Sequence, residues 1–299
     1  MIYAGMHGAK LITLPKFTPD SYISVLKGNP VTTAFVAPPL VLFLTHHPDV
    51  KIEYLKHLRR IVSGAAPLGQ LDEDKFKEKF GSHIKVKQGY GLTETSPIVC
   101  FHPNEIETKT NIGGSVGKPI PATLLKVINP DDPSGTPLGV HQKGELLVKG
   151  PQVMEGYHNR PEETKNAFLD GWLRTGDIVH YNEDGFVFVS DRLKELIKVK
   201  GYQVPPAELE EIIRDIPEVE DAAVIGIPHP INGEAPRAYV VPKKGKTVLP
   251  EAVQSYVADK VAKYKQLSGG VAVVQEIPKN PTGKILRRNL KLAYEKTGQ

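Results

Sequence analysis

Short apolar runs alternate with amphipathic stretches through the first hundred residues of the chain. The runs are rich in β-branched and aliphatic residues, which favour strands. They are LITL (11–14), TAFVA (33–37), RRIVS (59–63) and IKVKQGY (84–90). Apolar positions with helical spacing lie between them, in PDSYISVLK (19–27) and LDEDKFKEKF (71–80). This alternation predicts a parallel sheet with helices packed on it.

The pattern changes between residues 113 and 190. Gly, Pro and Asp separate short strand-like runs, which are ATLLKVI (122–128), GELLVKG (144–150) and GFVFVS (185–190). Closely spaced strands with turn residues between them predict a small antiparallel, barrel-like sheet.

A third pattern begins near residue 192. Pro205 and Pro206 precede an amphipathic helix at AELEEIIRDI (207–216), since proline suits the first turn of a helix. We expect strands at 221–227, 236–242 and 271–275 and helices at 249–261 and 285–296. The predicted fold is therefore mixed, α/β followed by α+β. Its domains are 1–190 (parallel α/β over 1–112, barrel-like over 113–190) and 191–299, with the boundary at Asp191-Arg192.

Composition narrows the functional classes. The chain has 299 residues, a length typical of about two domains. Its formal net charge of +4 is small and evenly spread, which argues against a nucleic-acid partner. Cys100 is the only cysteine, so no disulfide can form within the chain, and we expect a small buried side chain rather than a nucleophile.

No segment has the pattern of a membrane span or of a targeting signal. The longest apolar stretch, 31–44, is shorter than the ~18 residues that a span needs and contains two prolines. It predicts a buried strand that leads into a helix. The first ten residues lack the order of a signal peptide, and the final Thr-Gly-Gln is not a peroxisomal address. We therefore expect a cytoplasmic location.

QGYGLTETSP (88–97) is the first segment with candidate chemistry. Glycine lets the backbone approach a ligand closely. The Thr93 hydroxyl can bond a phosphate oxygen, and Glu94 offers the hard oxygen ligand that Mg²⁺ prefers. An ordinary strand-to-helix turn capped by threonine would contain the same residue types.

GWLRTGDI (171–178) is the second segment. Asp177 follows what we interpret as a tight Thr-Gly turn. A carboxylate can accept hydrogen bonds from both hydroxyls of a ribose. An Asx turn with no ligand is the alternative.

Two lysine-rich segments follow. In DRLKELIKVKGYQV (191–204), four cations lead into a turn at Gly201-Tyr202, an arrangement that suits a phosphate-rich ligand or a solvated basic face. In PKNPTGKILRR (278–288), Lys284 follows a Pro-Thr-Gly turn, where we place it at the start of a helix. There it can reach a phosphate, or it can be an ordinary surface lysine.

The order of these four segments resembles the adenylate-forming superfamily of acyl-CoA synthetases, 4-coumarate–CoA ligases and firefly luciferases. SGAAP (63–67), GYHNRPEETKNAF (156–168) and GYQVPPAELE (201–210) match the same family. The resemblance covers essentially the whole chain and is strongest to the 4-coumarate–CoA ligase and luciferase branch.

The resemblance implies a set of roles. Ala65 and Ala66 would line the adenine and acyl pocket. Gln88, Gly89, Tyr90 and Thr93 would surround the acyl-adenylate, with Glu94 as the Mg²⁺ ligand. Asp177 and Arg192 would bind the ribose. Lys194 and Lys198 would lie near the adenylate, Lys200 and Gly201 near CoA, and Asp191 would be the hinge. The implied catalytic residues are Lys284, Lys198 and Thr93.

The implied activity is that of an ATP-dependent acid–CoA ligase. ATP activates a small carboxylic acid, either aromatic or fatty, as an acyl-AMP. The small domain then rotates about Asp191, replacing the Lys284 face by the Lys200-Gly201 face, and the CoA thiol attacks the adenylate. Some members of the family are peroxisomal.

One family feature has no counterpart in this chain. Members carry a Ser/Thr/Gly-rich loop, ending Pro-Lys-Gly, that wraps the β- and γ-phosphates. GGSVGKP (113–119) is one residue short of the Walker spacing and has proline where Ser or Thr is needed, so we interpret it as a turn. We therefore expect a carboxyl-terminal part that adenylates poorly by itself. A luciferase-like monooxygenase and a non-catalytic nucleotide-binding protein stay open as alternatives.

Overall fold

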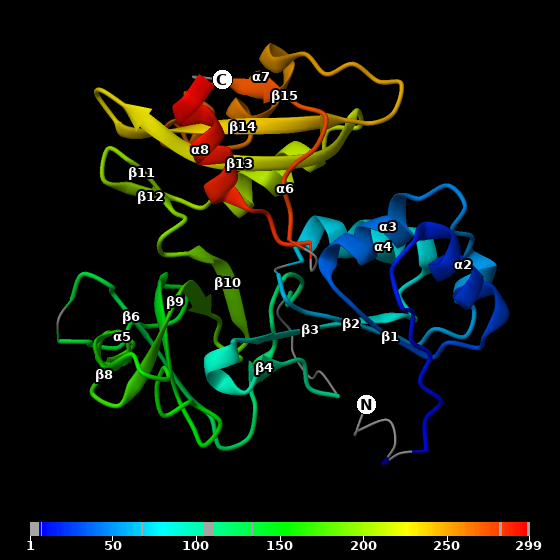
Figure 1. Ribbon diagram of the computed structural model, residues 1–299, viewed down its shortest axis with the longest axis horizontal. Helices are drawn as coiled ribbons and strands as arrows, with labels where there is room; N and C mark the ends of the chain where they lie inside the picture. The colour runs from blue at the N-terminus through cyan, green and yellow to red at the C-terminus, as the bar shows by residue number, and fades with distance from the viewer. Residues whose placement is uncertain are drawn as a thin grey trace.

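The chain forms three sheets with helices packed against two of them (Figure 1). The structure is a computed structural model that describes residues 6, 8–66, 68–104, 111–132, 134–280 and 283–297. No helix in these ranges is both long and apolar enough to cross a membrane.

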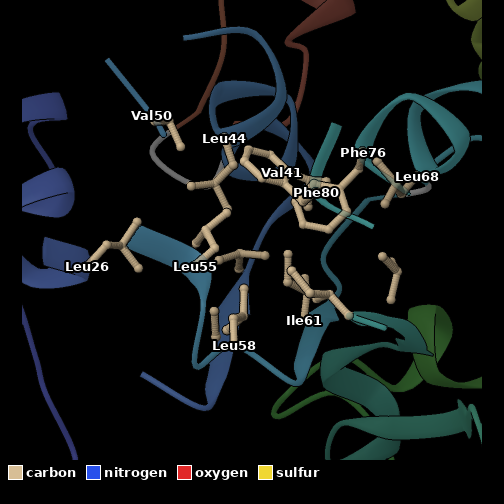
Figure 2. Packing of buried hydrophobic residues seen from close by; sticks show 14 of the residues in the cluster. Leu26, Val41, Leu44, Val50, Leu55, Leu58, Ile61, Leu68, Phe76 and Phe80 are labelled. Carbon is tan, nitrogen blue, oxygen red and sulfur yellow. The ribbon is translucent and has the colours of Figure 1, made fainter. Parts of the chain in front are cut away.

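The first sheet holds three parallel strands with helices on one face. The strands β1 (Thr33–Val36), β2 (Arg60–Ser63) and β3 (Lys85–Gly91) pair in register, and the helices α2 (Pro19–Gly28), α3 (Pro38–His46) and α4 (Gln70–Phe80) cover one face. A short 3₁₀ turn, Ile52–Leu55, completes this layer. Buried side chains from both the strands and the helices interlock beneath the helices, as Figure 2 shows.

The opposite face of these parallel strands carries an exposed aromatic side chain. Along β1 burial alternates, so that Ala34 and Val36 face the helices while Phe35 is 71% exposed. Parallel sheets are usually covered on both faces. Phe35 is therefore an exposed apolar position on the face that the described helices leave uncovered.

The predicted strand at 11–14 is wrong. Residues 11–14 lie in the described part of the chain and form no strand, and Leu11 is 48% exposed. A strand is stable only beside a hydrogen-bonded neighbour, and no described strand pairs with this segment. The other three predicted strands and both predicted helices of this region are confirmed.

The middle of the chain is antiparallel, as predicted. The strands β4 (Ile98–Phe101) and β5 (Lys118–Pro119) extend the first sheet, and GGSVGKP forms a turn at Gly113-Gly114 that leads into β5. The second sheet has the order β10-β9-β7-β6, with β8 beside β9. Its elements are β6 (Leu124–Ile128), β7 (Gly144–Lys149), α5 (Pro161–Asn166), β8 (Phe168–Leu169), β9 (Trp172–Tyr181) and β10 (Val187–Arg192).

The third sheet has helices on both faces. Its strands are β11 (Ile197–Val199), β12 (Tyr202–Val204), β13 (Val219–His229), β14 (Gly233–Pro242) and β15 (Val271–Val273). Its helices are α6 (Pro206–Arg214), α7 (Pro250–Ala258) and α8 (Arg287–Thr297), with a 3₁₀ turn at Lys263–Lys265. Ala222 and Val224 of β13 pack in the cluster of α6 and α7, while Ala223 and Ile225 pack in the cluster that contains Leu290 of α8. The period of two along β13 thus builds the predicted α+β unit, which we call the small domain.

Candidate functional site

Asp177 is the centre of a buried polar cluster. It lies on β9 directly opposite Arg192 of β10, and the Arg192 Nε lies 3.3 Å from Asp177 Oδ1. The Tyr90 hydroxyl, at the end of β3, donates to the other carboxylate oxygen at 2.5 Å. Asp177 is only 4% exposed. Residues predicted from three separate motifs therefore meet at one carboxylate.

A strand irregularity aims Asp177 at this cluster. We expected a tight Thr-Gly turn before it, but residues 172–181 form one strand, and the correction has a local cause. The register between β7 and β9 shifts between Glu145 and Leu147, and Gly176 has a φ of 68°. The Glu145 carboxylate accepts a hydrogen bond from the Gly176 N–H at 3.2 Å. Bulges of this kind re-aim a side chain without ending the strand.

Burial dominates the electrostatics of the cluster. It raises the pKa of Asp177 above its usual value, and the hydrogen bond from Tyr90 and the charges of Arg192 and Lys284 offset only part of that rise. Burial, and then the charge of Asp177, hold the pKa of Tyr90 well above its usual value. Tyr90 therefore keeps its proton and remains a donor.

Lys284, on the small domain, lies near enough to the cluster for its charge to act on Asp177. Its N–H donates to Asn280 Oδ1 at 2.9 Å, and Gly283 beside it has a φ of 84°. The Gly283 Cα packs so closely on Pro39 of α3 that a Cβ there would clash. Burial is the main cause that lowers the pKa of Lys284; Arg192 lowers it further, and Asp177 raises it. The turn that carries Lys284 is thus docked on the large domain.

Lys284 does not start a helix as we had predicted. The helix α8 begins at Arg287, and Ile285 instead forms an isolated bridge with Lys279. The chain between β15 and α8 runs from the small domain down toward α3 (Figure 1). This extended segment lets the ammonium group reach beyond its own domain.

Gln88 holds together two of the predicted loops. Ser63 of β2 and Gln88 of β3 are register partners, so the SGAAP loop and the QGYG segment lie side by side. The Gln88 side-chain amide exchanges hydrogen bonds with the backbone of Leu68, at 3.2 and 2.9 Å, and donates to Glu73 at 2.7 Å. Ala65 has a φ of 76°, a strained value for a residue with a side chain.

Gly89 needs the absence of a side chain for packing, because a Cβ there would lie 2.9 Å from the Phe101 ring. Ala66 is half-buried in the SGAAP loop. The functional roles given above to Ala65, Ala66, Gln88 and Gly89 stay predictions.

Thr93 and Glu94 lie on a 3₁₀ turn after β3, so the glycines before them belong to the strand and not to a turn. Glu94 Oε1 accepts a hydrogen bond from the Tyr157 hydroxyl at 2.8 Å, and Thr93 is exposed. The described residues contain no cluster of three or more His, Cys, Asp or Glu that could hold a metal. Mg²⁺ typically binds nucleotide sites through one or two carboxylates and the phosphates, and a single accessible carboxylate fits that mode.

The Lys198-to-Gly201 segment lies elsewhere. It forms the β11–β12 hairpin, in which Lys198 pairs with Gln203, and its turn has φ angles of 50° at Lys200 and 84° at Gly201. Lys200 lines a cavity of about 620 Å³ on the small domain. In Figure 1 the hairpin lies at the left of the small domain, apart from the chain between β15 and α8 that carries Lys284. Among the predicted lysines, Lys284 acts on Asp177 through its charge, and the exposed Lys194 acts on Lys284.

The sequence reasoning missed a buried arginine behind the site. Arg287 donates to Glu195 at 2.6 Å and forms a bidentate pair with Glu210 at 2.8 Å. Asp191, the predicted hinge, accepts hydrogen bonds from the N–H groups of Arg192 and Ala207, and burial raises its pKa to about 6. A glutamate in DRLKELIK (Glu195), a glutamate in PAELEE (Glu210) and an arginine after Lys284 were the available signal.

Cys100 is fully buried, and burial raises the pKa of its thiol to about 12, which confirms the expected structural role.

Two family models match the chain. The AMP-binding enzyme model matches residues 1–158, and the model of the AMP-binding enzyme C-terminal domain matches residues 208–284. The chain therefore belongs to the AMP-binding enzyme family, the adenylate-forming superfamily indicated by its motifs.

Its curated relatives are about twice as long. A probable 4-coumarate–CoA ligase 3 of Dictyostelium discoideum is 42% identical over 95% of this chain and 51% of its own length. The 4-coumarate–CoA ligase-like 4 of Oryza sativa subsp. japonica is 43% identical over 97% and 51%. A luciferin 4-monooxygenase of Nipponoluciola cruciata is 40% identical over 97% and 52%. The chain spans about half the length of these relatives.

Solved structures match the same region. ATP-bound MatB from Rhodopseudomonas palustris has a TM-score of 0.86 at 32% identity, over 97% of this chain and 56% of that one. Apo MatB, at the same identity and coverage, has a TM-score of 0.69. As a whole, the chain therefore superposes better on the ATP-bound form than on the apo form. The anthranilate CoA ligase AuaEII with anthranoyl-AMP has a TM-score of 0.83 at 27% identity, over 96% and 55%.

Proposed function

We propose that this chain is the carboxyl-terminal part of an ATP-dependent acid–CoA ligase of the 4-coumarate type. The observation that carries the proposal is the cluster at Asp177. There a buried carboxylate, a tyrosine hydroxyl and an arginine of β10 lie within electrostatic reach of a lysine that the small domain supplies. The names of the relatives point to the same reaction.

The cluster offers the donors and acceptors that an acyl-adenylate needs. Asp177 would accept hydrogen bonds from the ribose hydroxyls, with Arg192 beside it. Lys284 would pair with the substrate carboxylate and the α-phosphate. A carboxylate oxygen attacks the α-phosphorus, and the bond to the departing pyrophosphate breaks. The lowered pKa of Lys284 follows mainly from its burial, and an anionic ligand beside it would raise that pKa again.

Two further groups would assist the same step. The exposed Thr93 hydroxyl would bond a phosphate oxygen. Mg²⁺, when bound, would offset phosphate charge, and Glu94 is the residue that would hold it.

The second step would use the other lysine segment. We place the CoA thiol beside Lys200 and Gly201, with Lys198 near the adenylate after the small domain turns about Asp191. The thiol sulfur attacks the acyl carbon, AMP departs, and the thiol proton passes to solvent. The cavity lined by Lys200 offers room for part of the CoA chain.

We expect this chain to perform adenylate formation and the transfer to CoA to different extents. The sequence contains no loop for the β- and γ-phosphates, so activation of the acid by ATP should be very slow. Conversion of a supplied 4-coumaroyl-AMP to its CoA ester needs neither phosphate. We expect measurable ester formation, detected by chromatography, alongside ATP–pyrophosphate exchange near background.

Each outcome decides part of the proposal. Near-normal exchange would show that the missing loop is unnecessary. Binding of the acyl-AMP without ester formation would replace the ligase by a nucleotide-binding module, and light emission with luciferyl-AMP in place of an ester would support a monooxygenase. The variant D177A serves as the negative control, since it should lose both binding and ester formation.

A further inference from the structure

A glutamate of the small domain caps a helix of the large domain. The Leu71 N–H, in the first turn of α4, donates to Glu211 Oε1 of α6 at 3.1 Å. The N-cap residue of α4 is Gly69, which has no side chain to accept this hydrogen bond. The first N–H groups of a helix need an acceptor, and a carboxylate there also interacts favourably with the helix dipole. Glu211 supplies both from the other domain.

Gly69 leaves room for that carboxylate. A Cβ at position 69 would overlap the Glu211 carboxyl group. The backbone does not require glycine, because the φ of Gly69 is −70°. The glycine is therefore explained by the contact between the domains and not by the local turn.

Two ion pairs between α4 and the end of α6 flank this cap. Arg214 lies 3.5 Å from Asp72, and Asp215 lies 2.9 Å from Lys75. These contacts are polar and partly exposed, unlike a fused apolar core. An interface of that kind suits docking and release of a domain.

The same helix also holds the segment that carries Lys284. Glu210, adjacent to Glu211, forms the bidentate pair with Arg287, three residues beyond Lys284. A continuous set of contacts thus runs from the start of α4, through two neighbouring glutamates of α6, to the start of α8. Any rotation of α6 away from α4 would withdraw Lys284 from Asp177.

We propose that Glu211 is a positioning residue that latches the small domain in the orientation that places Lys284 beside Asp177. The cap on α4 forms only in this orientation and opens when the small domain turns. That the latched orientation serves adenylation rests on the proposed function. The latch itself rests on the contacts alone.

Spin-label distances test the latch without any assay of activity. Labels at E78C on α4 and K246C on the small domain occupy exposed positions, and the native Cys100 is buried. We expect one narrow distance distribution for the labelled chain in which Glu211 and Gly69 are unchanged. E211A should lower the docked population relative to undocked forms about five-fold, the usual cost of a lost cap. E211Q keeps an acceptor oxygen, so its distance distribution should stay narrow.

Two further variants separate a latch from a general loss of stability. G69A displaces the Glu211 carboxylate by a change at the start of α4, so it should lower the docked population as much as E211A does. The double variant should lower the docked population no further than either single variant. E208Q is the matched control, because Glu208 lies on the same helix but pairs with Lys265 inside the small domain. It should leave the distribution unchanged.

Binding and turnover complete the test. E211A should weaken binding of a non-hydrolysable acyl-adenylate about five-fold, with no fall in ester formation from a saturating supply of acyl-AMP. An unchanged distance distribution in both E211A and G69A overturns the latch. A broadened distribution with unchanged adenylate affinity retains the latch but overturns its link to Lys284.

Discussion

Two segments of the small domain each present a lysine beside a glycine with a positive φ, yet the fold gives them different surroundings. Lys284 follows Gly283, is half-buried, and lies in a turn packed on Pro39 of the large domain. Lys200 precedes Gly201, is exposed, and lines a cavity of the small domain. Lys284 feels the charge of Asp177.

This difference indicates that, in the present structure, only one of the two lysine segments is placed to act on a ligand at the Asp177 cluster. Lys284 has a lowered pKa because burial removes water from its ammonium group. A buried cation gains more from a phosphate or carboxylate than an exposed one does. On the proposed function, the segment at Lys284 would contact the adenylate, and the hairpin at Lys200 would take its place only after the small domain turned.

The largest effect is expected at Asp191, the residue about which the two segments would exchange. Its pKa of about 6 in the folded chain exceeds the unfolded value of 3.8, so folding favours its protonated form. Its contribution to stability is complete below about pH 4 and is lost as the pH rises through about 6. By linkage the loss is about 3 kcal/mol.

A comparison of the wild type with D191N isolates the pH-dependent contribution of the Asp191 carboxyl group to the free energy of unfolding. Urea unfolding at several pH values should show the free energy of unfolding of D191N rising relative to that of the wild type by about 3 kcal/mol between pH 3.5 and pH 7. The other titrating groups are common to both proteins and cancel. A constant difference across this range would mean that the Asp191 carboxylate carries no burial penalty.

A substitution of Asp177 should have the next largest effect. It should change ligand binding at the Lys284 segment and not at the Lys200 hairpin. D177A removes the acceptor proposed for two ribose hydroxyls, at about 2–3 kcal/mol, so affinity for an acyl-adenylate analogue should fall about 30- to 150-fold. Calorimetric titration measures the change, and D131A on an exposed turn should bind like the wild type. Equal affinity in D177A would remove this cluster from the nucleotide site.

The smallest expected effect on ligand binding distinguishes the roles of Lys284 and Lys200 directly. K284A should weaken binding of the same analogue about ten-fold, because one charged hydrogen bond is lost, while K200A should change it less than about two-fold. K246A, at an exposed site away from both segments, is the control. If K200A matched K284A, the small domain would spend comparable time in both orientations in solution.

Much of the fold could be predicted from local pattern. The β-branched and aliphatic content of TAFVA and the prolines before α6 identified elements that the structure contains. The failure at 11–14 has a non-local cause, since an apolar run becomes a strand only where a partner strand pairs with it. The bulge at Gly176 was misread as a turn because its acceptor, Glu145, is distant in sequence.

The candidate site shows the same division. The sequence by itself determined the residue types, their order and hence the family, because each motif is a short local segment. Only the tertiary structure decided that Asp177, Tyr90, Arg192 and Lys284 share one cluster while Lys198 and Lys200 lie elsewhere. It also decided that Glu211 caps a helix 140 positions away. The reason is physical: burial and charge act through space, and the packing of whole domains sets the distances across which they act.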